Sequence, residues 1–359
     1  MKRTHALLFV LAVSCLLGAV SCEKMYLGSK IRFKTRTRPD VVSTKAAYSG
    51  SSYTVGSTNY ERIDWSSGDE IVLAMKNNEV AVDYHYYTIS DISPEDRFSD
   101  AGLSPATGTG TGYGVNGLDW GEGLHDFWAA YPSSATVGDH TLSFEIPADQ
   151  TAIYNQKKNN VLLFDPDMDY AFMVASLQSN PTSNDLNLEF TPAFTAFDFS
   201  VSANSDVTVT KFVMDTEAYE TETSTIVPLS GTAVAEFDPS DNMSYSFSTA
   251  GTAGQTVELT FDDGNGSAYN PIMSTSTSMN FKVFALPQNL PGIRITFYFS
   301  DGSTRSLRLK QNDEWITFPA RAKVNIVGLL VPGATWYINF DHPRQEQWIV
   351  HPDIEIGVE

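Results

Sequence analysis

The side chains that could carry out acid–base or metal chemistry are six histidines and 43 aspartates and glutamates. None of the histidines has the H-x-x-x-H or H-x-H spacing of a zinc site, and no C-x-x-C pair exists. The sequence also lacks a G-x-S-x-G nucleophile turn and a glycine-rich phosphate loop that opens a helix. We therefore predict a protein that is not an enzyme and has no metal site and no cofactor.

Two acid-rich segments share only part of the pattern of a calcium loop. Asp165-Pro166-Asp167-Met168-Asp169 has the first three acids of such a loop but lacks its central glycine and closing glutamate. Asp262-Asp263-Gly264-Asn265-Gly266 has the composition of a hairpin turn. Both are predicted to be turns between strands. A pair of carboxylates could still meet in space as a glycoside hydrolase site, because spacing along the chain does not test this.

Cys22 is the residue whose surroundings indicate covalent chemistry. Lys2 and Arg3 precede an uncharged run, residues 6–20, which is typical of an export signal and too short to span a membrane. The run ends in Leu17-Gly18-Ala19-Val20-Ser21-Cys22, which is similar to a bacterial lipobox. We predict cleavage between Ser21 and Cys22 and attachment of lipid to the Cys22 thiol. The alternative is an ordinary secretory signal in which Cys22 occurs by chance.

The composition fits an exported chain that depends on a large core. Cys15 leaves with the signal, so Cys22 has no partner for a disulfide. The net charge of −20 disfavours nucleic acid and anionic membrane surfaces as partners. A chain of 359 residues is longer than a single hydrophobic core usually supports, which predicts two domains of roughly 150 residues each.

The pattern of apolar residues predicts strands almost throughout. Apolar and polar residues alternate in the runs 142–146, 257–261, 293–299 and 307–309, as in half-buried strands. Ser300-Asp301-Gly302-Ser303 predicts a tight hairpin, and Val161-Leu162-Leu163-Phe164 a strand buried on both faces. No window predicts an amphipathic helix of a dozen residues. The predicted fold class is therefore all-β, built of β-sandwiches.

The polar segment 178–185 is the best linker, and we place the domain boundary between residues 184 and 185. The C-terminal segment is unlike a usual chain end, because apolar residues alternate with polar ones at positions 336–340 and again at 354–358. Chain ends are usually polar and frayed, so an alternating end must be paired with something. It either completes the protein's own C-terminal domain or pairs with another chain.

Five short motifs follow one another along the chain. They are Ile31-Arg32-Phe33, with Arg36 and Arg38 after it, then Trp65-Ser66-Ser67-Gly68-Asp69-Glu70-Ile71, Trp128-Ala129-Ala130-Tyr131-Pro132, Phe190-Thr191-Pro192-Ala193-Phe194-Thr195-Ala196-Phe197 and Phe284-Ala285-Leu286-Pro287. Each is common in β proteins. In this order behind a lipobox, they resemble the fimbrillin family of surface lipoproteins, the subunits of type V pili, and the resemblance covers nearly the whole chain.

The resemblance implies two tandem transthyretin-like β-sandwiches with a C-terminal strand extension. The expected parts are a lipoprotein signal peptide (1–21), an N-terminal plug segment (22–45), two sandwiches (46–184 and 185–335) and a donor-strand extension (336–359). In this family a trypsin-like protease removes the first strand with its lipid, and the vacated groove takes the C-terminal strand of the next subunit. The candidate cleavage sites are Arg36, Arg38 and Lys45, and Arg36 is preferred because Pro39 follows Arg38.

Both ends of the chain carry the alternating apolar residues that strand exchange requires. Ile31 and Phe33 could fill an apolar trough as a plug strand, with the basic residues beside them facing water. In a neighbouring subunit the same kind of trough would take the predicted donor-strand residues, which are Trp348, Ile354, Ile356 and Val358. Because this contact is head to tail, it produces an open filament.

We therefore predict a structural pilus subunit that supports adhesion, first an outer-membrane lipoprotein precursor at the cell surface and then part of a fimbrium. The expected partners are copies of itself or related pilins, a processing protease and a host or bacterial surface receptor. The alternative is a monomeric, permanently anchored carbohydrate-binding surface lipoprotein, with Tyr84, Tyr86 and Tyr87 as a candidate sugar-binding face. A surface glycoside hydrolase is the third alternative.

Overall fold

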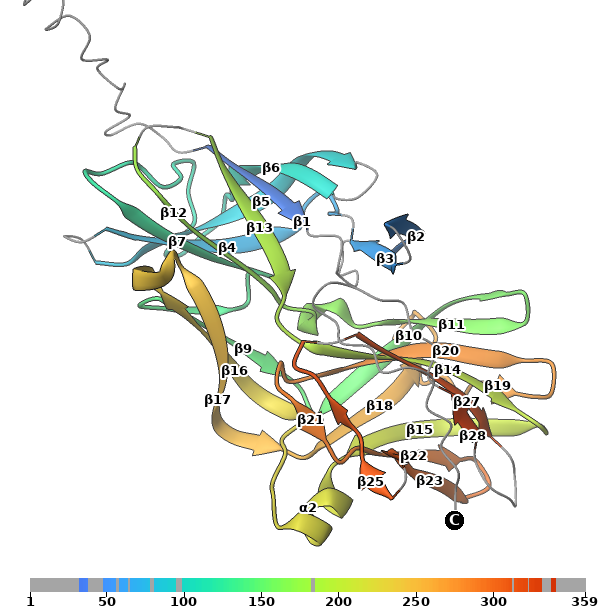
Figure 1. Ribbon diagram of the computed structural model, residues 1–359. Helices are drawn as coiled ribbons and strands as arrows, with labels where there is room; N and C mark the ends of the chain where they lie inside the picture. Colours follow the sequence, from blue (N-terminus) through green and yellow to red (C-terminus); the bar gives the residue numbers. More distant parts are fainter. Residues whose placement is uncertain are drawn as a thin grey trace, which may run out of the picture.

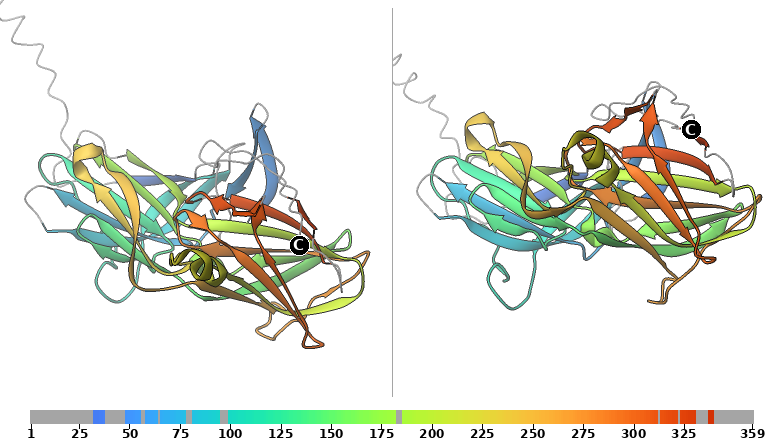
Figure 2. Two further views of the ribbon diagram at one scale, coloured as in Figure 1. Left: turned by 60° about the horizontal axis from the view of Figure 1, so that its bottom comes forward. Right: turned by 90° about the horizontal axis from the view of Figure 1, so that it is seen from below.

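The computed structural model describes residues 32–37, 48–55, 58–63, 65–77, 81–94, 99–181, 185–311, 313–321, 323–330 and 337–339. Strands make up most of this chain and helix only a small share, which confirms the all-β prediction. A short helix, α2 (Glu217–Thr223), lies on the outside (Figure 2), and 3₁₀ turns occur at Met168–Tyr170 and Pro239–Asp241. Small two-stranded units are β2 (Tyr48–Val55) with β3 (Thr58–Ile63), β21 (Leu290–Pro291) with β26 (Thr317–Phe318), and β24 (Lys310–Gln311) with β25 (Glu314–Trp315).

One sheet of the described chain closes on itself, in the order β1-β13-β12-β7-β4-β5-β6 and back to β1 (Figure 1). Its interior is filled by aromatic and branched side chains, among them Trp65, Leu73 and Phe127, all buried. The strands are β1 (Arg32–Thr37), β4 (Glu70–Asn77), β5 (Asp83–Pro94), β6 (Ser99–Pro105), β7 (His125–Tyr131), β12 (Met173–Ser179) and β13 (Asp185–Pro192).

A smaller sheet covers part of the outer face of this closed sheet. Its strands, in the order β17-β16-β9-β8, are β8 (Thr136–Gly138), β9 (Thr141–Ile146), β16 (Ser230–Asp238) and β17 (Ser244–Gly254). Trp128 of β7 and Phe144 of β9 belong to one buried cluster between the two sheets. The Phe144 ring stacks on Phe172, with centroids 4.6 Å apart. Part of the outer face of the closed sheet is therefore buried as well.

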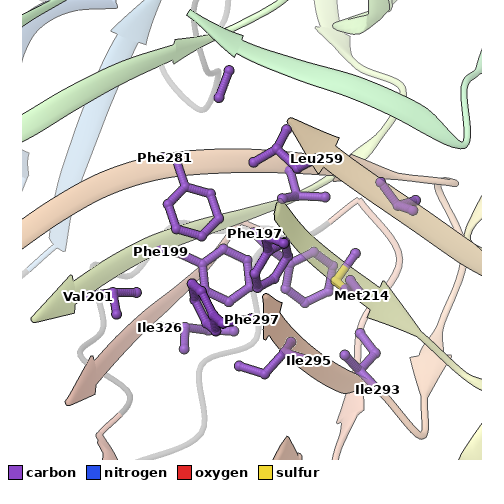
Figure 3. Packing of buried hydrophobic residues seen from close by; sticks show 14 of the residues in the cluster. Phe197, Phe199, Val201, Met214, Leu259, Phe281, Ile293, Ile295, Phe297 and Ile326 are labelled. Atoms are coloured by element: carbon purple, nitrogen blue, oxygen red, sulfur yellow. The ribbon is translucent and has the colours of Figure 1, made fainter. Parts of the chain in front are cut away.

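The third sheet is large and curled around its own core. Its described strands follow the order β23-β22-β15-β18-β10-β11-β20-β14-β27-β28, and β19 pairs with β15. Phe199, Phe281 and Phe297 meet inside it (Figure 3), and the Phe199 and Phe281 rings stack at 5.0 Å. The strands are β10 (Asp149–Lys158), β11 (Val161–Pro166), β14 (Thr195–Ala203), β15 (Val207–Asp215), β18 (Thr256–Asp262), β19 (Ile272–Met273), β20 (Ser278–Ala285), β22 (Arg294–Phe299), β23 (Thr304–Arg308), β27 (Lys323–Leu330) and β28 (Tyr337–Asn339).

The sheets do not follow the predicted boundary between residues 184 and 185. β13 begins at Asp185 and belongs to the closed sheet, whereas β10 and β11, which precede the boundary, pair with β18 and β20 of the large sheet. β16, which follows the boundary, pairs with β9. The physical reason is that an alternating pattern specifies which face of a strand is buried but not which strand lies beside it.

The alternating runs are buried as predicted, and the hairpin between β22 and β23 forms. Leu142, Phe144 and Ile146 are all buried. In the hairpin, the Asp301 carboxylate accepts hydrogen bonds from the Ser303 backbone N–H at 2.8 Å and from its hydroxyl at 2.7 Å. The glycine between them has a φ of +82°, which glycine adopts without strain.

The apolar run at the start of β11 differs from its prediction. Leu162 and Phe164 are buried, but Val161 and Leu163 are only half-buried. The strand therefore has one core face, not two. A continuous apolar run is compatible with cover on both sides, but the covering layers are supplied by distant parts of the chain.

The Phe281 ring is expected to be a major support of the large sheet, because it is fully buried and contacts Phe199, Phe212 and Phe297. We predict that Phe281→Ala lowers the free energy of unfolding by about 3–5 kcal/mol. Urea denaturation followed by tryptophan fluorescence measures this. Val115→Ala is the control, since Val115 is 81% exposed. Equal effects of the two substitutions would contradict the packing described.

Candidate functional site

β1 is paired with neighbours on both sides. It runs parallel to β13 over six residue pairs and antiparallel to β6 over three. Within the described chain, it is the strand that joins these two and closes the sheet. If β1 were removed, β13 and β6 would each present unpaired N–H and C=O groups, and a gap one strand wide would lie between them. We call this position the β1 slot.

The sides of the β1 slot carry apolar side chains that belong to the core of the closed sheet. Leu186, Leu188 and Phe190 of β13 are buried, as is Ala101 of β6. The Trp65 ring meets Phe190 edge-on, with centroids 5.4 Å apart. An extended peptide that alternates apolar and polar residues would match both the open edges and this apolar lining.

The pairing register divides the residues of β1 into two rows, one on each face of the strand. Arg32, Lys34 and Arg36 are paired with Asp185, Asn187 and Glu189, while Phe33, Thr35 and Thr37 are paired with Leu186, Leu188 and Phe190. Asn187 and Glu189 are exposed, whereas the β13 partners of the second row are buried. Phe33 therefore stands at a register position opposite a buried residue. The sequence indicated this alternation but not the strands on either side.

Most of the predicted site residues lie outside the described residues. These are Ser21, Cys22, Ile31, Arg38, Lys45, Trp348, Ile354, Ile356 and Val358. Phe33 and Arg36 are described, and both are in β1. Arg36 is paired with Glu189 on one side and Asp100 on the other, so its backbone is part of the sheet.

The first part of the predicted donor extension pairs with the protein's own large sheet. β28 is antiparallel to β27, with Ile338 opposite Gly328. For residues 337–339 the structure favours the alternative, in which the strand completes its own sheet. The extension predicted to start at residue 336 is thus not wholly available to a neighbour.

A polar pocket of about 490 Å³ lies on the outer face of β13, the strand that borders the β1 slot. Its lining residues are Ser176, Asn187, Glu189, Thr191, Met243, Ser244, Tyr245 and Arg321. Arg321 is held in place because its Nε donates to the Pro192 carbonyl at 2.8 Å and its guanidinium lies 5.3 Å from the Tyr245 ring centre. The sequence did not predict the pocket, because its members are distant along the chain and share no motif.

The three tyrosines predicted as a sugar-binding face do not form one surface. Tyr87 is buried, its hydroxyl accepts a hydrogen bond from the Leu118 N–H at 2.8 Å, and burial raises its pKa. Tyr84 and Tyr86 are half-buried against the cluster between the closed sheet and the smaller sheet. The Tyr86 ring stacks on the Tyr113 ring, with centroids 4.3 Å apart. The loop that carries Tyr113 thus covers part of the predicted face.

The two carboxylates of the acid-rich turn after β18 accept hydrogen bonds from the backbone of the same turn. Asp262 accepts the backbone N–H groups of Gly264 and Gly266, and Asp263 accepts those of Asn265 and Ser267. These bonds lower the pKa of Asp263, because they stabilise its charged form. The segment is therefore a self-contained turn, as the sequence predicts.

Among the residues that the structure describes, no three histidines, cysteines or acids are grouped so as to hold a metal ion. Within the same ranges, no helix has the length and hydrophobicity that crossing a membrane requires.

His125 is a neutral structural residue at the start of β7. It is fully buried, its Nε2 accepts the Gly121 N–H at 3.2 Å, and its Nδ1 lies 3.0 Å from the Gly123 carbonyl. This pattern requires a proton on Nδ1 and none on Nε2. Burial lowers the pKa of His125, although the Gly123 carbonyl and Asp126 oppose the shift.

The lowered pKa of His125 predicts a pH-dependent loss of stability. The folded state binds the proton less readily than the unfolded state, so the free energy of unfolding decreases as pH falls below about 6.5. His125→Gln keeps a donor and an acceptor but does not titrate. Urea titrations between about pH 7.5 and 5 should show a steeper loss for the wild-type chain than for this variant. Parallel curves would contradict the assignment.

Comparison with known proteins shows the fold of the chain but not its family. No protein-family profile matches the sequence, and no curated protein matches it. The solved structures that are similar at TM-scores below 0.5 include the following two. A proposed cell adhesion protein from Bacteroides ovatus is 11% identical, with 90% of this chain and 99% of that chain covered and a TM-score of 0.48. The fimbrial anchor protein Mfa2 from Porphyromonas gingivalis is 8% identical, with 86% of this chain and 97% of that chain covered and a TM-score of 0.35.

Another similar solved structure has a TM-score of 0.50. It is a proposed cell adhesion protein from Bacteroides uniformis, which is 12% identical and aligns over 87% of this chain and 97% of its own. The alignment spans nearly the whole of both chains. The chain is therefore similar to that protein in overall fold.

Proposed function

We propose that this chain is a structural subunit of a type V pilus, exported as a lipoprotein, trimmed near its N-terminus and polymerised by donor-strand exchange at the bacterial surface. Lipid on Cys22 would carry the precursor to the outer membrane, and the assembled fimbrium would support adhesion. Two sandwiches (46–184 and 185–335) would form each subunit, with strands shared between them. The resemblance of the ordered motifs to fimbrillins supports this assignment.

The observation that carries the proposal is the position of β1. It is the most N-terminal strand of the described chain, it is six residues long, and it closes the sheet between β13 and β6. Basic residues that a trypsin-like protease could recognise lie in it and after it, at Arg36, Arg38 and Lys45. Removal of residues 22–45 would take away β1 and leave the other strands of the closed sheet in the chain.

A donor strand would replace what β1 supplies. Three buried aliphatic side chains contribute on the order of 5 kcal/mol, and pairing with β13 and β6 adds hydrogen bonds along both edges. Ile354, Ile356 and Val358 have the required alternation. The segment proposed to reach the neighbouring subunit is therefore the end of the chain, residues 348–359, which follows β28 in sequence.

The pairing of β1 changes the preferred cleavage site. A protease needs an extended and accessible substrate, but Arg36 is paired on both sides within the sheet. Cleavage after Arg36 therefore requires the end of β1 to open first, and Pro39 disfavours cleavage after Arg38. We place the first cut after Lys45, with Arg36 as a second site.

Carbohydrate binding by a monomeric lipoprotein is the second candidate, and the polar pocket is the observation that favours it. Ser176, Asn187 and Glu189 offer donors and acceptors in a space that could hold a monosaccharide. The test is a glycan array probed with the untrimmed chain. Binding that is lost in Asn187→Ala, with unchanged stability, would support this candidate.

Trimming should convert the precursor into a polymerising subunit. We predict that limited trypsin digestion removes residues up to Lys45 and yields ladders that resist SDS, because many hydrogen bonds must break together before an exchanged strand can leave. Mass spectrometry of the new N-terminus and gels of unheated samples measure the two steps. Lys45→Gln should delay trimming more than Arg36→Gln does.

Deletion of residues 352–359 is the matched control for the ladder. The truncated chain should be trimmed at the same rate yet remain monomeric, since it keeps the β1 slot but lacks the donor strand. Ladders of equal length from the truncated chain, or a trimmed full-length chain that stays monomeric, would rule out strand exchange between copies of this chain.

Cys22 should carry a lipid that is lost on maturation. Cys22→Ala is expected to abolish labelling of the chain by a clickable fatty acid in cells. After trimming, the label of the wild-type chain should be found in the released N-terminal fragment and not in the polymer. Label that stays with the polymer would favour the permanently anchored alternative.

A further inference from the structure

One row of β1 is basic, and most of its register partners are acidic. Arg32, Lys34 and Arg36 alternate along the strand. Their register partners in β13 include Asp185 and Glu189, and Arg36 is also paired with Asp100 of β6. Residues of opposite charge are thus register partners at both ends of β1, an arrangement that is favourable between neighbouring strands.

Exposed acidic side chains border this row on both sides. Glu189 of β13 is exposed and is the register partner of Arg36. On the other side, Gly102 of β6 is the register partner of Lys34, and a Cβ added to this glycine would lie 3.3 Å from Oδ2 of the exposed Asp91. Without β1, the β1 slot would keep these two carboxylates and lose the basic row of β1.

The protein's own tail carries the opposite pattern to β1. Ile354, Ile356 and Val358 alternate with Asp353, Glu355 and Gly357, and Glu359 ends the chain. Side chains alternate strictly between the two faces of a strand, so a shift of register by two residues keeps the same row outward. Any register that points the three apolar residues into the core therefore places the acids in the row bordered by Glu189 and Asp91.

We infer that the β1 slot prefers a strand from a different subunit, one whose outward positions carry lysine, arginine or neutral residues, over the tail of another copy of this chain. The inference rests on the proposed function, because it names the partner of the β1 slot. Like charges across neighbouring strands are destabilising, and such repulsion suppresses wrong partners. Copies of this chain can still join when they are the sole donors, but the favoured junction at this slot is between unlike subunits.

Peptide exchange in the full-length chain tests the inference. A specific protease site placed within residues 38–47 would let β1 be cut free yet stay bound, so that its displacement by added peptides can be followed. The peptides are the protein's own residues 348–359 and the same peptide with Asp353→Lys, Glu355→Lys and Glu359→Lys. A third peptide, residues 30–37, reports whether the slot can be refilled at all.

The basic peptide should bind about tenfold more tightly than the native tail at low salt, and the difference should shrink in about 0.5 M NaCl. The same basic peptide with Ile356→Pro controls for attraction to an acidic protein, because proline breaks strand pairing but leaves the charge unchanged. It should not displace β1. In the chain that provides the β1 slot, Glu189→Lys combined with Asp91→Lys should remove or reverse the preference for the basic peptide over the native tail.

The outcomes separate this inference from the proposed function. If the native tail displaces β1 as well as the basic peptide does, the slot does not discriminate against its own chain and the inference is wrong, while strand exchange stands. If neither of these peptides nor residues 30–37 can refill the slot, strand exchange itself is contradicted. A proline-containing peptide that binds as tightly as the basic peptide would also overturn the inference.

Discussion

The constraint on which the closed sheet depends is the pairing of β1 with both β13 and β6. Backbone N–H and C=O groups at a sheet edge must find partners, and an exposed edge recruits other strands. In the described chain β1 meets this requirement for two edges at once. It contributes only six residues, whereas the apolar lining beneath it comes from β13, β6 and Trp65. Much of the apolar lining beneath β1 is therefore supplied by other parts of the closed sheet.

Several residues of the motifs that carry the family resemblance are packing residues, inside the closed sheet or between sheets. Trp65 is buried against Phe190, and Asp69 accepts the Ser66 backbone N–H at 2.9 Å, which closes the turn before β4. Phe194 lies between β13 and β14 and meets the Phe284 ring at 4.7 Å, so it links the closed sheet to the large one. Such residues describe an architecture and not a chemistry.

The polar pocket lies on the outer face of β13, and the β1 slot lies along one edge of the same strand. Asn187 and Glu189 line the pocket and are also the register partners of Lys34 and Arg36. A strand that replaced β1 would bring its own outward side chains next to these two residues. Strand selection and ligand binding at this face would therefore involve the same polar groups, and the pilus and carbohydrate proposals concern neighbouring surfaces of one strand.

Local sequence was sufficient for the all-β class, the buried rows of the alternating runs, the hairpin at Asp301 and the two rows of β1. Each of these follows from the period of two and from turn chemistry within a few residues. Three-dimensional contacts were needed to show that β10 and β11 join the large sheet, that Tyr87 is buried, and that Arg321 meets β13 in a pocket. The reason is that periodicity specifies which way a side chain points, whereas strand partners are chosen by contacts between residues far apart in the chain.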